Sequence, residues 1–129
     1  MDKCPDEQPA IRVTAMPADA NFNGDIFGGW ILSWMDLAAG TAASRRARGR
    51  AVTAAIDALS FHHPVHIGDE LSVYAKVTSV GRTSMKIAVE AWQRTHASDA
   101  TSKVTSANFV CVAIDAEGRP RPVPPEDVP

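Results

Sequence analysis

One long apolar segment, from Phe27 to Ser44, constrains the fold of this chain more than any other feature. Its only charged residue is Asp36, and a run of arginines followed by Gly49 marks its end as that of a helix. A helix that is apolar on nearly all sides must be buried by neighbouring elements. A lone carboxylate in such a helix is costly unless another group pairs with it or the protein uses it. We therefore expect a buried central helix with Asp36 as a candidate reactive group.

Beyond this helix the pattern changes from helical to alternating. Apolar and polar residues alternate over 71–78 and again over 85–92, with a turn at Gly81 and Arg82 between them. The expected strands are 11–15, 51–61, 71–78, 85–92 and 104–114. This order predicts an α+β fold in which an antiparallel sheet wraps around one helix. The last strand carries few charges, so we expect it to be central and covered on both faces.

The composition divides the chain into three parts. We expect residues 1–9 to form a flexible leader, 10–116 the folded domain, and 117–129 a proline-rich tail that is extended or disordered. A chain of 129 residues is long enough to bury a real core without disulfides or metals.

Charge and cysteine content exclude several classes of function. The net charge of −2 leaves no electrostatic footprint for nucleic acid. Cys4 and Cys111 make neither a disulfide framework nor a metal-ligand spacing, so we expect free thiols in a reducing cytoplasm. The first ten residues lack the apolar core of a signal peptide, and the helix is slightly short for a membrane span and contains Asp36, so we expect no membrane association.

A zinc site is suggested only by the His62-His63-x-x-His66 spacing. This run spans Pro64 at a strand end rather than one face of a helix, and no Cys or Glu stands at a useful spacing. We expect no metal.

Two glycines open the long helix. Gly28 and Gly29 either let the helix pack closely on the sheet or present backbone N–H groups to a developing oxyanion, aided by the helix dipole. Asp36 is either an acid satisfied by a partner, a general base or a nucleophile. It lies about 10 Å along the axis from Gly29, too far for both to act on one carbonyl within a chain. If both are catalytic, two antiparallel helices of a symmetric dimer must share the site.

Two loops hold further candidates. Asn21 precedes the helix and serves either as a turn residue or to orient water or a carbonyl. Gly81, Arg82, Thr83 and Ser84 form a hairpin turn whose N–H groups, hydroxyls and guanidinium are also suited to hold a phosphate.

Three stretches carry a resemblance to a known family: Met16–Asp36 (MPADANFNGDIFGGWILSWMD), Phe61–Leu71 (FHHPVHIGDEL) and Val80–Trp92 (VGRTSMKIAVEAW). They resemble the hot-dog-fold acyl-CoA thioesterases, and within these the YciA-like bacterial enzymes related to the cytosolic acyl-CoA hydrolases. The resemblance runs from about Ile11 to Pro124.

The resemblance implies a hot-dog fold, a homodimer that assembles further into a trimer of dimers, and hydrolysis of acyl-CoA to fatty acid and coenzyme A. It implies that Asn21 of one subunit and Asp36 of its partner form the catalytic pair, with an N–H near Gly28 or Gly29 at the oxyanion. Gly81 to Ser84 would contact the coenzyme A part of the substrate. No separate cofactor is implied.

Two other functions compete with this one. A non-catalytic module that binds acyl-CoA would share the fold, but the Asn21 and Asp36 pair is intact here. A hot-dog hydratase would need a histidine beside the helix, and none precedes or lies within it.

Overall fold

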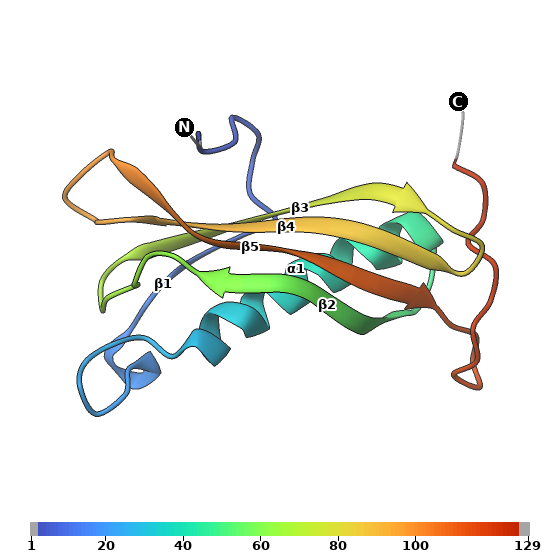
Figure 1. Ribbon diagram of the computed structural model, residues 1–129, viewed down its shortest axis with the longest axis horizontal. Helices are drawn as coiled ribbons and strands as arrows, with labels where there is room; N and C mark the ends of the chain where they lie inside the picture. The colour runs from blue at the N-terminus through green and yellow to red at the C-terminus, as the bar shows by residue number, and fades with distance from the viewer. Residues whose placement is uncertain (1–2, 127–129) are drawn as a thin grey trace.

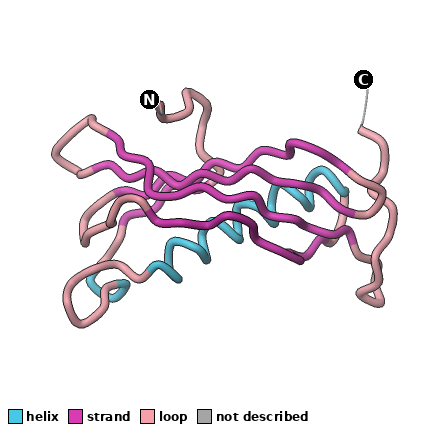
Figure 2. Tube along the Cα trace, in the orientation of Figure 1, coloured by secondary structure: helices cyan, strands magenta, loops and turns pink. Residues whose placement is uncertain are grey.

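The long helix α1, Gly28–Ala47, lies across one face of an antiparallel sheet (Figure 1). The computed structural model describes residues 3–126, and within them the sheet has five strands in the order β1-β3-β4-β5-β2 (Figure 2). The other elements are β1 Ile11–Thr14, the short 3-10 helix η1 Pro17–Asp19, β2 Ala51–Phe61, β3 Glu70–Val80, β4 Ser84–Arg94 and β5 Thr101–Ala113. The predicted α+β arrangement of one strand, one long helix and four further strands is confirmed.

The core forms between one side of α1 and the facing side of the sheet. The helix contributes buried residues at helical spacing, and the strands contribute every second residue, as the alternation predicts. The helix residues are Ile31, Met35, Ala38, Ala39, Ala43 and Ala47, and the largest strand residues are Leu71, Val73, Met85, Ile87, Val89 and Phe109. The many alanines let the helix axis approach the sheet closely.

The expectation that α1 is buried on nearly all sides is wrong for the single protomer. Only the side toward the sheet is covered, and Leu37 on the opposite side is 54 % exposed. Asp36, expected to be a buried acid, is exposed. The physical reason is that one sheet can cover only one side of a helix, so the apolar residues on the other sides are left without a cover from their own chain.

Strand β5 also departs from expectation. It is an inner strand, paired with β4 on one side and β2 on the other. Its side chains toward the helix, such as Phe109 and Cys111, are buried, whereas Asn108 and Val110 on the other face are partly exposed. The strand is therefore covered on one face, not on both.

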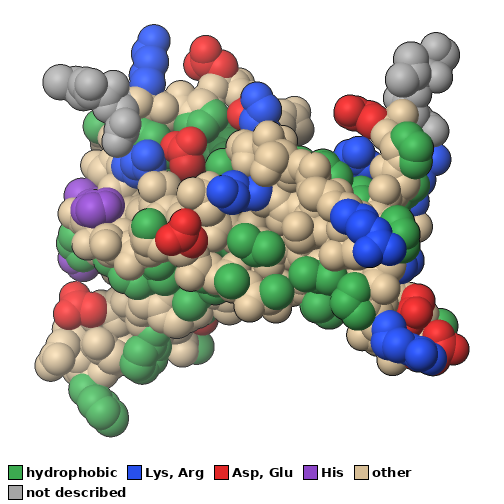
Figure 3. Space-filling model, turned by 45° about the vertical axis from the view of Figure 1, so that its right-hand side comes forward, with side chains coloured by type: hydrophobic (Ala, Val, Ile, Leu, Met, Phe, Trp, Pro, Cys, Tyr) green, Lys and Arg blue, Asp and Glu red, His purple; other side chains and the backbone are tan. Residues whose placement is uncertain are grey.

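Strand β2 is the outer strand on its side of the sheet, and within the described residues its outer edge pairs with no other strand. It is 11 residues long and exposes the apolar side chains of Val52, Ile56 and Phe61. Figure 3 shows hydrophobic side chains in several places on one face of the molecule. An open edge of this length with apolar side chains is a site for pairing with another chain.

The pairing of β2 with β5 is irregular between Asp57 and Ser60, and Ala58 there has a φ of 56°. This left-handed conformation costs an L-residue roughly 1–2 kcal/mol, a cost that glycine avoids.

We expect Ala58→Gly to raise the free energy of unfolding by about 0.5–1 kcal/mol, because relief of this strain exceeds the entropy that glycine adds to the unfolded chain. The control is Ala55→Gly in the same strand, which lacks a positive φ and should lose about 0.5–1 kcal/mol. Urea denaturation at one fixed protein concentration measures both. Equal losses in the two variants would contradict the strain assigned to Ala58.

The segments outside the sheet are hydrogen-bonded to it. Ala10 N donates to Val73 O at 2.8 Å, and Val123 N donates to Arg82 O at 2.8 Å. Arg46 Nη1 donates to Pro124 O at 2.6 Å. The described part of the tail therefore contacts both the end of α1 and the turn between β3 and β4. Residues 1–2 of the expected leader and 127–129 of the expected tail lie outside the described residues.

Candidate active site

The carboxylate of Asp36 is held by strand β2. Thr53 Oγ1 donates a hydrogen bond to Asp36 Oδ1 at 2.5 Å. Among residues 3–126 the second carboxylate oxygen, Oδ2, has no hydrogen-bond partner. The acid is thus fixed in orientation by one oxygen and free to react through the other.

This carboxylate opens into a groove between α1 and β2 with a volume of about 450 Å³. The residues that line the groove are Gly29, Leu32, Ser33, Asp36, Thr53 and Ile56. Leu32 and Ile56 make apolar walls beside the polar group formed by Ser33, Asp36 and Thr53. The groove therefore suits a molecule with a reactive polar centre and an apolar arm.

The two glycines at the start of α1 have different environments. A Cβ on Gly28 would lie 3.2 Å from the ring of Phe61, whereas a Cβ on Gly29 would meet nothing within 4 Å. Close packing on β2 therefore explains Gly28, and Gly29 leaves open space in the groove that it lines.

The first backbone N–H groups of α1 are also available. Those of Trp30 and Ile31 donate to Phe27 O at 3.1 and 3.4 Å. Within the described part of the chain, those of Gly28 and Gly29 have no partner. Two free donors at the positive end of a 20-residue helix can stabilise a developing negative charge.

Asn21 shapes the loop before the helix. Its Oδ1 accepts hydrogen bonds from the backbone N–H of Asn23 at 2.9 Å and of Asp25 at 3.1 Å, and its own N–H donates to Asp25 O at 2.8 Å. The turn role is confirmed, while the side-chain NH₂ remains available to a second molecule. Asn21 is absent from the groove of its own protomer, so the structure does not bring it together with Asp36 within one chain.

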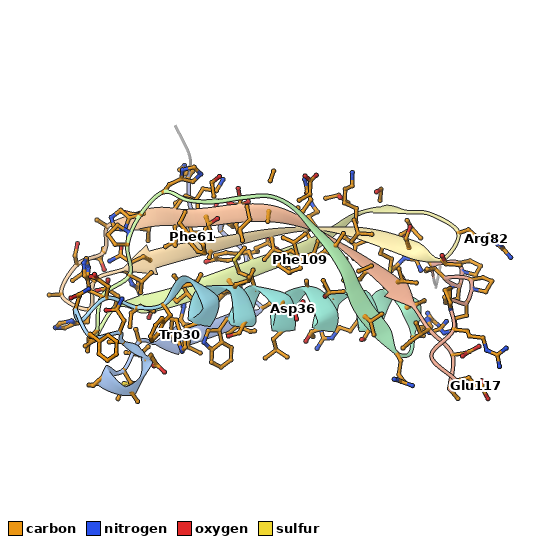
Figure 4. All side chains as sticks on the ribbon, turned by 60° about the horizontal axis from the view of Figure 1, so that its bottom comes forward. Trp30, Asp36, Phe61, Arg82, Phe109 and Glu117 are labelled. Carbon is orange, nitrogen blue, oxygen red and sulfur yellow. The ribbon has the colours of Figure 1, made fainter. Side chains whose placement is uncertain are left out.

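The turn Gly81–Ser84 lies far from the groove. Figure 4 places Arg82 at one end of the molecule, Asp36 near the middle of α1, and Trp30 toward the other end. Gly81 N donates to Ser84 O at 2.8 Å, and Thr83 O accepts from Ala113 N at 2.9 Å. The predicted hairpin turn is confirmed, and one protomer keeps it apart from Asp36.

The sequence did not identify four residues that line the groove, Leu32, Ser33, Thr53 and Ile56, nor Cys111, which lies next to Thr53. Cys111 Sγ lies 3.8 Å from Thr53 Oγ1, and burial, with a smaller effect from the charge of Asp36, raises the pKa of the Cys111 thiol. The thiol is therefore neutral at neutral pH and fully buried, so it is not a candidate nucleophile. A threonine in a strand gives no signal by itself that it contacts an acid 17 residues earlier.

The described residues contain no cluster of three or more potential metal-ligating side chains. Of the helices in residues 3–126, none has the length and apolar character needed to cross a bilayer.

Residues 23–100, more than half of the chain, match the family model of the thioesterase superfamily. The chain therefore belongs to the thioesterase superfamily.

Individual relatives are similar in sequence to this chain over almost its whole length. A protein of Zymomonas mobilis named an uncharacterized acyl-CoA thioester hydrolase is 53 % identical over 121 residues, which cover 94 % of this chain and 81 % of that protein. The acyl-CoA thioester hydrolase YciA of Escherichia coli K12 is 44 % identical over 119 residues, 90 % of each chain. The predicted resemblance to YciA-like enzymes is confirmed.

Solved structures confirm the hot-dog fold. A hexameric thioesterase of Yersinia pestis superposes with a TM-score of 0.89 at 40 % identity, over 95 % of this chain and all of that one. A hexameric hotdog-fold thioesterase of Campylobacter jejuni gives 0.85 at 40 % identity, over 92 % of this chain and 91 % of that one.

Proposed function

We propose that this protein is an acyl-CoA thioester hydrolase that releases a free fatty acid and coenzyme A. The observation that carries the proposal is the Asp36 carboxylate, fixed by Thr53 in an open groove that extends to Gly29 in the first turn of α1. The names of the relatives, which are acyl-CoA thioester hydrolases, support the same substrate class. They do not favour a non-catalytic module that only binds acyl-CoA.

The active site is shared between two protomers. Helix α1 and strand β2 run side by side in opposite directions, because Asp36 contacts Thr53 and Gly28 lies against Phe61. Antiparallel pairing of two β2 edges about a two-fold axis near Asp57 sets Thr53 of one protomer opposite Phe61 of the other. The carboxylate of one protomer then faces the helix start of its partner.

The reaction follows from this arrangement. Asp36 of one protomer takes a proton from water as the water oxygen attacks the thioester carbonyl carbon, and the N–H groups of the partner's Gly28 and Gly29 hold the resulting oxyanion. Collapse of the intermediate breaks the C–S bond, and the coenzyme A sulfur leaves with the proton. Asn21 orients the water or the thioester through its free NH₂ group. Direct attack by Asp36 is the alternative, and a single turnover in ¹⁸O-labelled water would place label in the Asp36 carboxylate only by that route.

The remaining assignments complete the proposal. Gly81 to Ser84 contact the coenzyme A part of the substrate, which needs no separate cofactor. The dimer assembles into a trimer of dimers, supported by the hexameric thioesterases of the same fold. The protein acts in the cytoplasm, where free thiols such as Cys4 and Cys111 persist.

Release of free thiol from a panel of short, long and aromatic acyl-CoAs tests the function directly. We expect turnover that requires Asp36. Binding of acyl-CoA without turnover of any ester would favour the non-catalytic module instead.

Variants of Thr53 test whether its hydroxyl orients the Asp36 carboxylate or contributes to substrate binding. Thr53→Val keeps the size of the side chain and removes the hydrogen bond to Asp36, so we expect kcat to fall about 10- to 100-fold with KM changed by no more than about twofold. Thr53→Ser restores the hydroxyl and should recover most of kcat. Equal kcat in the valine and serine variants would contradict a role for this hydrogen bond.

A further inference from the structure

Phe22 is the most exposed of the large hydrophobic residues among 3–126, with a relative exposure of 108 % for the whole residue, so it is essentially uncovered. It follows Asn21 in the loop between η1 and α1, which projects beyond the start of α1 in Figure 1. The residues on either side of the phenylalanine in the turn, Asn21, Asn23 and Gly24, are polar or small and offer it no apolar contact. An aromatic ring held wholly in water gains nothing for its own protomer.

The loop that carries the ring is held in shape. Ala20 and Ile26 form a bridge across its base, and Asp25 forms another with His66. The side chain of Asn21 bonds two backbone N–H groups inside the loop. The exposure of Phe22 therefore belongs to a built turn that presents the ring outward.

We propose that Phe22 is a specificity-determining residue whose ring covers the acyl chain of the substrate in the groove of the partner protomer. The inference rests on the proposed function, in which Asn21 of one protomer reaches Asp36 of the other. Since Phe22 is the next residue in the chain, its ring then reaches the same groove, where Leu32 and Ile56 form apolar walls. An acyl chain on those walls would keep one side in water, and the ring covers that side.

The charge of the loop favours the acyl chain over the coenzyme A end of the substrate. Residues 16–26 include Asp19 and Asp25 but no lysine or arginine. Coenzyme A carries several negatively charged phosphates, which these carboxylates repel. The neutral acyl arm is the part of the substrate that suits this loop.

The test is the dependence of kcat/KM on acyl length, measured with acetyl-, butyryl-, hexanoyl- and octanoyl-CoA. Full burial of each methylene strengthens binding about fourfold, so we expect loss of the ring in Phe22→Ala to lower kcat/KM for octanoyl-CoA about 10-fold and for acetyl-CoA less than about twofold. Phe22→Leu should restore most of the octanoyl-CoA activity. Ile67→Ala truncates another exposed apolar residue, 43 % exposed beside the bridge to this loop, and should leave the length dependence unchanged.

Three results would overturn the inference. These are an unchanged length dependence in Phe22→Ala, an equal loss for all esters, and dissociation of the oligomer on size-exclusion chromatography, which would make the ring an interface residue. They differ from failure of the proposed function, in which the wild-type protein hydrolyses none of the esters and both proposals fall together.

Discussion

Asp36→Asn is expected to lower kcat for acyl-CoA hydrolysis by about 100- to 10,000-fold, because an amide neither takes a proton from water nor attacks a thioester. The fold should survive the change. The amide side chain would keep an oxygen that accepts the hydrogen bond from Thr53, and the wild-type carboxylate is exposed in the protomer, so no buried charge is lost. Thiol release measures kcat, and thermal unfolding monitors the fold.

Asp99→Asn is the matched control, since Asp99 is also an exposed aspartate but lies in the loop between β4 and β5. It should retain the wild-type kcat and KM. An Asp36→Asn protein with most of its kcat, when Asp99→Asn is equally active, would remove Asp36 from the mechanism.

Mixing two inactive variants should restore activity. A dimer of one Asn21→Ala protomer and one Asp36→Ala protomer contains one site with both defects and one site with neither, if each site takes Asn21 and Asp36 from different protomers. Random exchange of equal amounts makes half the dimers mixed, so we expect about a quarter of the wild-type activity. Thiol release before and after joint unfolding and refolding provides the measurement.

Native mass spectrometry verifies that exchange has taken place, and each variant refolded alone provides the baseline. If both functional groups came from the same chain, every site in the mixture would keep at least one defect. Mixed dimers without activity would therefore show that the site is not shared between protomers.

The sequence predicted the backbone arrangement closely because local patterns determine it. Alternation over 71–78 and 85–92 anticipated strands at Glu70–Val80 and Ser84–Arg94, and the turn between them was also anticipated. These signals depend on residues near one another in the chain, where period and turn chemistry are strong guides.

The surroundings of Asp36 could not be predicted in the same way. An apolar helix indicates that its sides need a cover, but the pattern does not say whether the same chain or another chain supplies it. The contact with Thr53 depends on how α1 and β2 align after the turn that joins them, which periodicity does not determine. The roles of the two glycines could not be predicted either. The Phe61 ring packs against Gly28 and leaves open space at Gly29, and the sequence pattern does not show where this ring lies.

The open outer edge of β2 makes folding depend on assembly with other chains. A folded protomer with an 11-residue open edge and apolar side chains can template further strands, so the surface that we propose pairs two protomers also permits aggregation. Folding and assembly are then linked, so the apparent melting temperature should rise with protein concentration. In a cell, the yield of active enzyme would depend on how quickly newly made chains meet one another.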